Sequence, residues 1–151
     1  MTQTNLPKIC ENFIYEFFNK DKTACCFRFS DTHDTFQGRG RGVILPSAPS
    51  DFVVTHLNIT YYAEVKSTIS PIGLTASLFK QQELRRNKIL KAGGEYWYFI
   101  YSETCDRWFV ISGKLISENP NLKWESLMQR PASKTEKEIN LAWKTRLFLV
   151  K

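Results

Sequence analysis

The stretch PSDFVVTHLNITYYAEVKST, residues 49–68, decides the expected fold. Its two runs of β-branched and aromatic residues, at 51–56 and 58–67, are typical of strands. Leu57 and Asn58 lie where the runs meet, and so short a connection favours a tight turn between antiparallel neighbours. The stretch therefore predicts a β-hairpin, and the rest of the chain is expected to pack around it.

Three charged side chains gather on one face of this hairpin. Counting outward from a turn centred on Leu57 and Asn58 places Asp51 opposite Glu64, with their Cβ atoms about 5 Å apart. Lys66 follows Glu64 by two residues, so it points to the same face. Facing carboxylates repel, and a divalent cation between them removes the repulsion. The alternative is that Glu64 and Lys66 form a solvated strand face and that Asp51 caps a turn.

The metal interpretation predicts a particular chemistry. Carboxylate oxygens suit Mg²⁺, which keeps several waters and accepts a backbone carbonyl, here that of Val65. The predicted ligands are therefore Asp51, Glu64 and the Val65 carbonyl. A metal-bound water is easily deprotonated and attacks phosphorus, while Lys66 orients it and offsets charge in the transition state. Together these residues indicate a Mg²⁺-dependent phosphodiesterase.

Composition limits the classes of protein that are possible. At 151 residues the chain has the size of one domain, and 42% apolar with 24% charged residues is ordinary for a folded protein. A net charge of +6 and a pI near 9.2 favour a polyanionic partner such as nucleic acid. Four cysteines without a CxxC pair argue against zinc, and no run is long and apolar enough for a bilayer. We therefore expect a reduced, cytoplasmic protein without a membrane segment.

The other expected elements alternate between helices and strands. In chain order they are a helix at 6–20, a strand at 24–30, a long loop at 31–51, the hairpin, a helix at 74–94 that ends on two glycines, strands at 95–103 and 106–116, and a helix from about 135. This order predicts an α/β domain with a mixed central sheet flanked by helices.

Asp51 followed by the Glu64–Lys66 triplet resembles the motif of the PD-(D/E)XK nuclease superfamily. The chain departs from that motif because Ser50, rather than proline, precedes the aspartate. The resemblance extends over about 6–112 and leaves 113–151 as a C-terminal extension. It implies one nuclease domain, 1–151, built on a restriction-endonuclease-like core.

The resemblance also implies further catalytic residues. Holliday-junction resolvases in this superfamily have a glutamate in their first helix and a glutamine in the helix after the motif. Glu11 matches the glutamate, with Glu16 as the second choice. Gln81 and Gln82 match the glutamine equally well. The alternative for all of them is a solvated helix surface.

Two basic segments are candidates for binding DNA. The sequence QGRGRG, 37–42, combines arginines that contact base edges or phosphates with glycines that let a loop follow a groove; a flexible exposed turn is the alternative. The helix at 74–94 has a cluster of basic side chains that would contact backbone phosphates. The predicted DNA-binding residues are Gln37, Arg39, Arg41, Lys80, Arg85 and Arg86.

A small chain with this core and an inserted Arg-Gly loop resembles the compact PD-(D/E)XK homing endonucleases of bacterial group I introns. That resemblance implies a double-stranded DNA target and a homo-oligomer, dimer or tetramer. Trp143, Leu147 and Phe148 would supply an interface or close the core. The leading hypothesis is a Mg²⁺-dependent, site-specific double-strand DNA endonuclease of homing type. The alternatives are a structure-selective Holliday-junction resolvase with the same active site and a non-catalytic, basic DNA-binding module.

Overall fold

The computed structural model describes residues 5–29 and 48–131 of the chain. The predictions for the QGRGRG loop with Gln37, Arg39 and Arg41, for the helix from about 135 and for an interface at the apolar C-terminal end fall outside these residues. They stay predictions. In the described part of the chain, no helix has the length and apolar character needed to cross a membrane.

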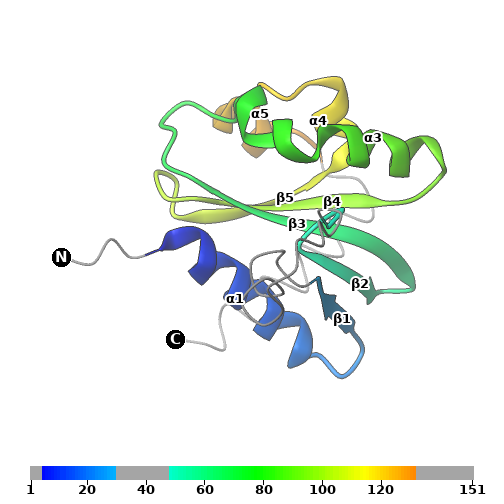
Figure 1. Cartoon of the computed structure of the whole chain (residues 1–151). Helices are drawn as coiled ribbons and strands as arrows, with labels where there is room; N and C mark the ends of the chain where they lie inside the picture. The colour runs from blue at the N-terminus through cyan, green and yellow to red at the C-terminus, as the bar shows by residue number, and fades with distance from the viewer. Residues whose placement is uncertain (1–4, 30–47, 132–151) are drawn as a thin grey trace, which may run out of the picture.

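A mixed five-stranded sheet forms the centre of the fold (Figure 1). Its strands lie side by side in chain order, and they are β1 (Cys25–Arg28), β2 (Phe52–His56), β3 (Ile59–Thr68), β4 (Tyr96–Ser102) and β5 (Arg107–Ser112). Strands β3 and β4 are parallel, whereas the other neighbours are antiparallel. The expected α/β class with a mixed sheet is confirmed.

The hairpin of β2 and β3 has the predicted register. Phe52 pairs with Ala63, and each later pair is consistent with a turn of two residues. These residues are Leu57 and Asn58, with φ of 53° and 62°. Left-handed backbone at both central positions matches the twist of an antiparallel ribbon. Leucine adopts it at a cost of about 1–2 kcal/mol, which the strand pairing offsets.

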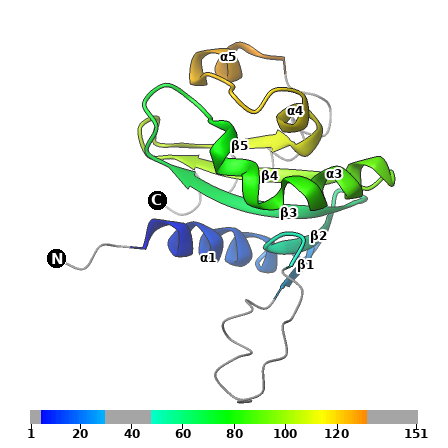
Figure 2. The same cartoon turned by 45° about the horizontal axis from the view of Figure 1, so that its top comes forward.

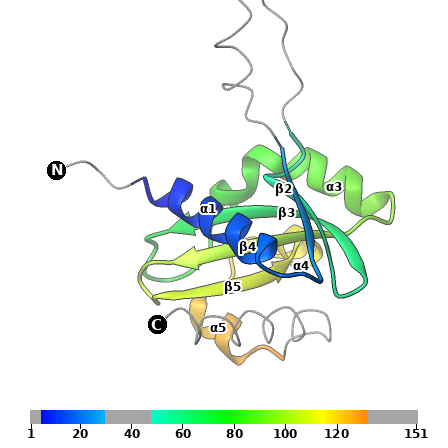
Figure 3. The same cartoon turned by 90° about the horizontal axis from the view of Figure 1, so that it is seen from below.

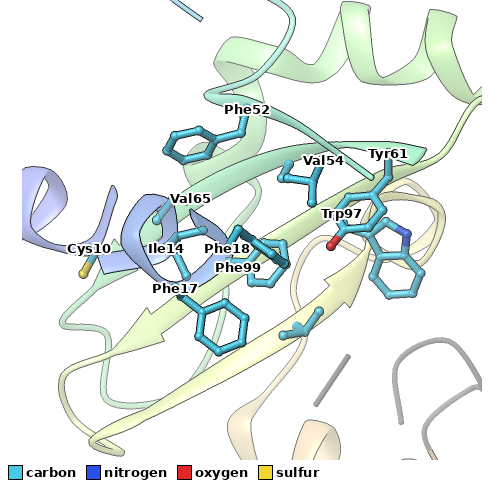
Figure 4. Packing of buried hydrophobic residues seen from close by; sticks show 12 residues of the cluster. Cys10, Ile14, Phe17, Phe18, Phe52, Val54, Tyr61, Val65, Trp97 and Phe99 are labelled. Carbon is cyan, nitrogen blue, oxygen red and sulfur yellow. The ribbon is translucent and has the colours of Figure 1, made fainter. Parts of the chain in front are cut away.

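Helix α1 (Leu6–Asn19) covers one face of the sheet, as the view from below shows (Figure 3). Asn5 caps its first turn, and Pro7 lies in that turn, where a missing N–H costs nothing. Its apolar side chains pack into a core with those of β2, β3 and β4 (Figure 4). The principal members are Cys10, Ile14, Phe17, Phe18, Phe52, Val54, Tyr61, Val65, Trp97 and Phe99. The predicted helix at 6–20 is confirmed.

The opposite face of the sheet is covered by shorter helices (Figure 2). They are the 3₁₀ helix η1 (Ala76–Gln82), α3 (Glu83–Lys91), α4 (Gly113–Glu118) and α5 (Trp124–Gln129). Aromatic side chains dominate this second core: Phe79 lies edge-on to Tyr98 at 4.8 Å, and Phe109 stacks on Trp124 at 5.0 Å. Because helices cover both faces, the sheet can be apolar on both sides.

The single helix predicted at 74–94 is instead a 3₁₀ segment followed by an α-helix. Two tertiary contacts hold the first part: the Ala76 N–H donates to Asn121 Oδ1 at 3.1 Å, and Phe79 is buried in the second core. The predicted C-terminal end is confirmed. Gly93 has φ of 84°, and the Gly94 N–H donates to the Ile89 carbonyl at 2.9 Å, as in a Schellman motif.

The strand predicted at 106–116 extends four residues too far at its C-terminal end, because β5 ends at Ser112 and α4 begins at Gly113. Ser112 caps the helix by accepting the Lys114 N–H at 3.2 Å. A Cβ atom at Gly113 would lie 2.9 Å from the Tyr96 carbonyl oxygen, so only glycine fits there. Helix α5 was not predicted, because its six residues are too short to show a helical period.

Candidate active site

The acidic residues of the motif lie at a notch in the sheet. Strand β2 starts at Phe52, which pairs with Ala63, whereas β3 continues to Thr68. On its other side β3 pairs with β4 along this whole extension. Among the described residues, no strand therefore pairs with the β2 side of β3 beyond Ala63, and other groups must satisfy its backbone there.

Asp51 closes this open side of β3. The Val65 N–H donates to Asp51 Oδ2 at 2.7 Å, and the carboxylate thus takes the place of a carbonyl that a neighbouring strand would supply. In return the Asp51 N–H donates to Glu64 Oε2 at 3.1 Å. Each carboxylate thus accepts a backbone N–H from the other side of the pair: Asp51 from Val65, the residue after Glu64, and Glu64 from Asp51 itself. The structure brings the predicted pair, Asp51 and Glu64, together.

Lys66 completes the motif on the same face of β3. Its Nζ lies 2.8 Å from Glu64 Oε1, and the side chains are only 16% and 4% exposed. A charge-assisted bond between two buried groups is stronger than its surface equivalent. One ammonium therefore faces two carboxylates, and the motif retains a net negative charge.

Burial makes this negative charge unfavourable in the absence of a cation. Burial, followed by the charge of Glu64, raises the pKa of Asp51 from an ordinary value of 3.8 to about 7, although the Val65 N–H and Lys66 act against the shift. Burial also raises the pKa of Glu64, opposed chiefly by the charge of Lys66. The pair of carboxylates therefore favours binding of a proton or of a metal ion.

We expect Asp51→Asn to stabilise the metal-free protein at neutral pH. Because the folded form binds this proton more tightly than the unfolded form, stability falls as the pH rises from about 4 to about 7. Asparagine keeps an acceptor for the Val65 N–H without the charge. A gain of about 1 kcal/mol raises Tm by about 2–4 °C in a domain of this size. Thermal melts in EDTA measure it: the gain should be present at pH 8 and smaller at pH 5, and equal Tm values at pH 8 would contradict it.

Glu11 reaches the same end of the sheet from α1. Its Oε2 lies 2.7 Å from Arg28 Nη2 and 3.9 Å from Lys8 Nζ. Its charge raises the pKa of both Asp51 and Glu64, so it lies close to the acidic pair. The described residues nevertheless contain no group of three acidic, histidine or cysteine side chains placed to hold one metal ion.

The second choice for the helix glutamate, Glu16, points elsewhere. Its side chain is 67% exposed and lies 3.6 Å from Lys20 Nζ, in an ordinary surface ion pair one helical turn away. Of the two glutamates in α1, only Glu11 is therefore close to the pair.

The two candidate glutamines have different environments. Gln81 is exposed, whereas the Oε1 of Gln82 is buried and accepts no hydrogen bond from the described residues. Gln82 lies between Phe79 and Arg86 at helical spacing, and both of these contact Tyr98. Tyr98 is the register partner of Glu64. The Gln82 amide consequently lies over the face of the sheet that carries the acidic pair.

The basic residues of η1 and α3 do not form one surface. Lys80 is exposed and Arg85 is half-buried, so both remain predicted contacts for DNA phosphates. Arg86 is only 3% exposed, and its guanidinium donates to Tyr98 Oη at 3.3 Å and to Asn87 Oδ1 at 3.2 Å. The prediction that Arg86 belongs to the basic cluster that contacts DNA is wrong, because Arg86 follows Phe79 by seven residues and shares the helix face that turns toward the sheet.

Two residues near the site were missed in the sequence. Arg28, at the end of β1, bonds to Glu11, and the Tyr96 hydroxyl donates to the Pro49 carbonyl at 2.8 Å, which anchors the segment leading to Asp51. Tyr96 could not be recognised as a site residue from the sequence, because a tyrosine is ordinary in an apolar, aromatic strand. For Arg28, strand alternation could indicate only which face of β1 it lies on. Its partner on β2 could not be predicted, because a long segment separates the two strands in the sequence.

The oxygen donors around the pair suit a small, hard cation. In a strand, the N–H and C=O of one residue point to the same side, so the Val65 carbonyl shares the Asp51 side with its N–H. Two carboxylates and a carbonyl are donors that Mg²⁺ accepts, with waters filling its other positions. The residues present therefore fit the expected ion, which Asp51, Glu64 and the Val65 carbonyl would hold.

Neither a protein-family model nor a curated protein matches the sequence. Twelve chains of known structure do match. One of them is Hjc from Archaeoglobus fulgidus, a Holliday junction resolvase from an archaeal hyperthermophile; the TM-score is 0.51 with 14% identity, over 80% of this chain and 89% of that chain. At this identity the likeness shows the fold alone. The sheet flanked by helices is thus consistent with the fold of a resolvase nuclease.

Proposed function

We propose that this chain is a divalent-metal-dependent DNA endonuclease that cleaves four-way junctions. The hydrogen-bonded pair of a partly buried Asp51 and a buried Glu64, with Lys66 Nζ 2.8 Å from Glu64, is the observation that carries the proposal. The likeness of its fold to that of an archaeal Holliday junction resolvase supports the junction as substrate in preference to a homing site. The net charge of +6 supports a polyanionic substrate.

The chemistry follows from the positions of these side chains. A bound metal ion would make a coordinated water more acidic and neutralise charge on the phosphate. Asp51 and Glu64 supply the negative charge that holds the ion. Lys66 would donate a hydrogen bond to the attacking water and stabilise the oxyanion that develops at phosphorus. We place the substrate on the β2 side of β3, where Asp51, and no described strand, lies beside β3 beyond Ala63.

Cleavage assays on defined DNA test the proposal. Two four-way junctions of unrelated sequence, linear duplexes made from the same arms, and a random linear library are incubated with Mg²⁺ or with EDTA. We expect Mg²⁺-dependent cuts in both junctions and none in the linear arms. Cleavage of one linear sequence without preference for junctions would instead indicate a homing endonuclease. DNA binding without any cleavage would indicate a non-catalytic module.

The environments of the two glutamines lead to a paired prediction. We expect Gln82→Ala to lower single-turnover cleavage about tenfold or more, because the buried Oε1 of Gln82 has no hydrogen-bond partner among the described residues and would accept one from the water or the substrate. Gln81→Ala, the matched control one residue earlier, should stay within about twofold of wild type because that side chain is exposed. The opposite ranking would assign the role to Gln81.

A further inference from the structure

We propose that Arg28 binds a phosphate of the DNA strand beside the acidic pair, and that Glu11 is the residue that positions it. This inference rests on the proposed function, since the phosphate belongs to the DNA that the pair would cleave. It departs from the role that the family resemblance implies for Glu11, which is to complete the metal pocket.

The guanidinium of Arg28 is held from three directions. Its Nη2 donates to Glu11 Oε2 at 2.7 Å, its Nη1 donates to Asn12 Oδ1 at 3.1 Å, and its central carbon lies 5.7 Å from the centre of the Phe52 ring. Consecutive residues of α1 supply both acceptors. An arginine fixed in this way loses little further conformational entropy on binding a ligand.

Arg28 still has hydrogen-bonding capacity after these contacts. A guanidinium has five N–H donors, and the two bonds to α1 use one on each terminal nitrogen. Among the described residues, no other acceptor bonds to it. Its side chain is 29% exposed, so a ligand can reach it. The free donors match the oxygens of a phosphate, which arginine binds with two bonds at once.

Arg28 also lies at the correct end of the sheet. It pairs with Phe52, the residue directly after Asp51, and the next residue, Phe29, donates its N–H to the Asp51 carbonyl at 2.9 Å. A phosphate on Arg28 would thus lie at the same end of the sheet as the notch where Asp51 meets Glu64, on the face that α1 covers. A DNA strand entering the notch would meet Arg28 at its edge.

The position of Glu11 favours support of Arg28 over a role as metal ligand. Its Oε2 is committed to the guanidinium at 2.7 Å, and it is not grouped with the acidic pair as a third ligand in the described structure. Glu16 on the same helix, by contrast, is a surface residue paired with Lys20. Glu11 therefore fixes the direction of the Arg28 donors.

Binding of a fluorescent four-way junction tests the inference, with Ca²⁺ in place of Mg²⁺ and the salt concentration varied. Arg28→Gln should weaken binding about tenfold and reduce the salt slope by about 1, as expected for one lost phosphate contact. Arg28→Lys should keep the salt slope but weaken binding, because lysine keeps the positive charge but lacks the paired N–H donors of a guanidinium. Arg107→Gln, an exposed arginine on β5, is the matched control and should leave the slope unchanged.

Glu11→Gln distinguishes the two roles of the glutamate. Simple electrostatics predicts that removing a negative charge strengthens DNA binding. If Glu11 positions Arg28, the variant instead binds the junction more weakly, and this loss disappears in the Arg28→Gln background. Calorimetric titration of the DNA-free protein with Mn²⁺ should give an affinity within about twofold of wild type.

The outcomes distinguish the proposed roles of Arg28 and Glu11 from that of Glu11 as a metal ligand. An unchanged salt slope in Arg28→Gln, or a loss of Mn²⁺ affinity of about tenfold in Glu11→Gln, overturns the inference while leaving the endonuclease proposal intact. A wild-type chain that neither binds nor cleaves DNA overturns both. Retained circular dichroism spectra and Tm values identify variants whose loss of binding is not a loss of fold.

Discussion

Glu64→Gln is expected to reduce cleavage of a four-way junction by at least about 10³-fold while junction binding is retained or strengthened. Glutamine has the same shape, and its single oxygen can keep one of the two bonds that Glu64 accepts, from the Asp51 N–H on Oε2 and from Lys66 Nζ on Oε1. What it lacks is the charge that would hold the metal ion. Because the side chain is 4% exposed, solvent cannot replace that charge. Losing one of two carboxylates also removes repulsion of the phosphate.

Single-turnover cleavage and anisotropy in Ca²⁺, measured on the same preparations, check this result. Glu16→Gln is the matched control, because it makes the same chemical change on the exposed side of α1 and should leave both quantities unchanged. Full cleavage by Glu64→Gln would show that the acidic pair is not the active site. A loss of both binding and cleavage with a lower Tm would point to a structural role.

Lys66→Met is expected to have the second largest effect, a loss of at least about 10²-fold in single-turnover rate. The ammonium lies 2.8 Å from Glu64 Oε1 and is 16% exposed, so its charge acts in a largely buried setting. Methionine keeps most of the length and apolar volume of the side chain. Without the ammonium, the pKa of Glu64 and of Asp51 rises further, since Lys66 lowers both.

The pH dependence separates two ways in which Lys66 could act. If it served only to keep the carboxylates ionised, raising the pH to about 9 would restore the rate of Lys66→Met to that of wild type. We expect the rate to stay low at that pH, because the ammonium also stabilises charge at phosphorus. Lys114→Met, an exposed lysine on α4, controls for the loss of one positive charge from a DNA-binding protein.

Local features of the sequence were sufficient for most of the fold and for the acidic pair. A two-residue turn sets the register of a hairpin, so Leu57 and Asn58 determined that Asp51 faces Glu64. Alternation then placed Lys66 beside Glu64. The apolar period of α1 and the glycines after α3 likewise act over a few residues, and both were predicted correctly.

The switch of helix type was the part that local spacing did not predict. A 3₁₀ helix turns by about 120° per residue and an α-helix by about 100°, but Phe79, Gln82 and Arg86 share one face in either case. Contacts with distant parts of the chain hold the 3₁₀ segment: Phe79 is buried in the second core, and the Ala76 N–H donates to the exposed Asn121 Oδ1. The burial of Phe79 shows which face this is, and it is the face that buries Arg86 and distinguishes Gln82 from Gln81.

The sequence by itself thus determined the hairpin, the sheet class and the three charged residues of the motif. Each of these follows from residues that lie near one another in the sequence. Only the tertiary structure decided what surrounds them. It brought Glu11 to the end of the sheet and paired it with Arg28 at 2.7 Å. That contact joins a helix to the edge strand β1. The register of β1 against β2 cannot be derived from local periodicity, because a long segment separates the two strands in the sequence.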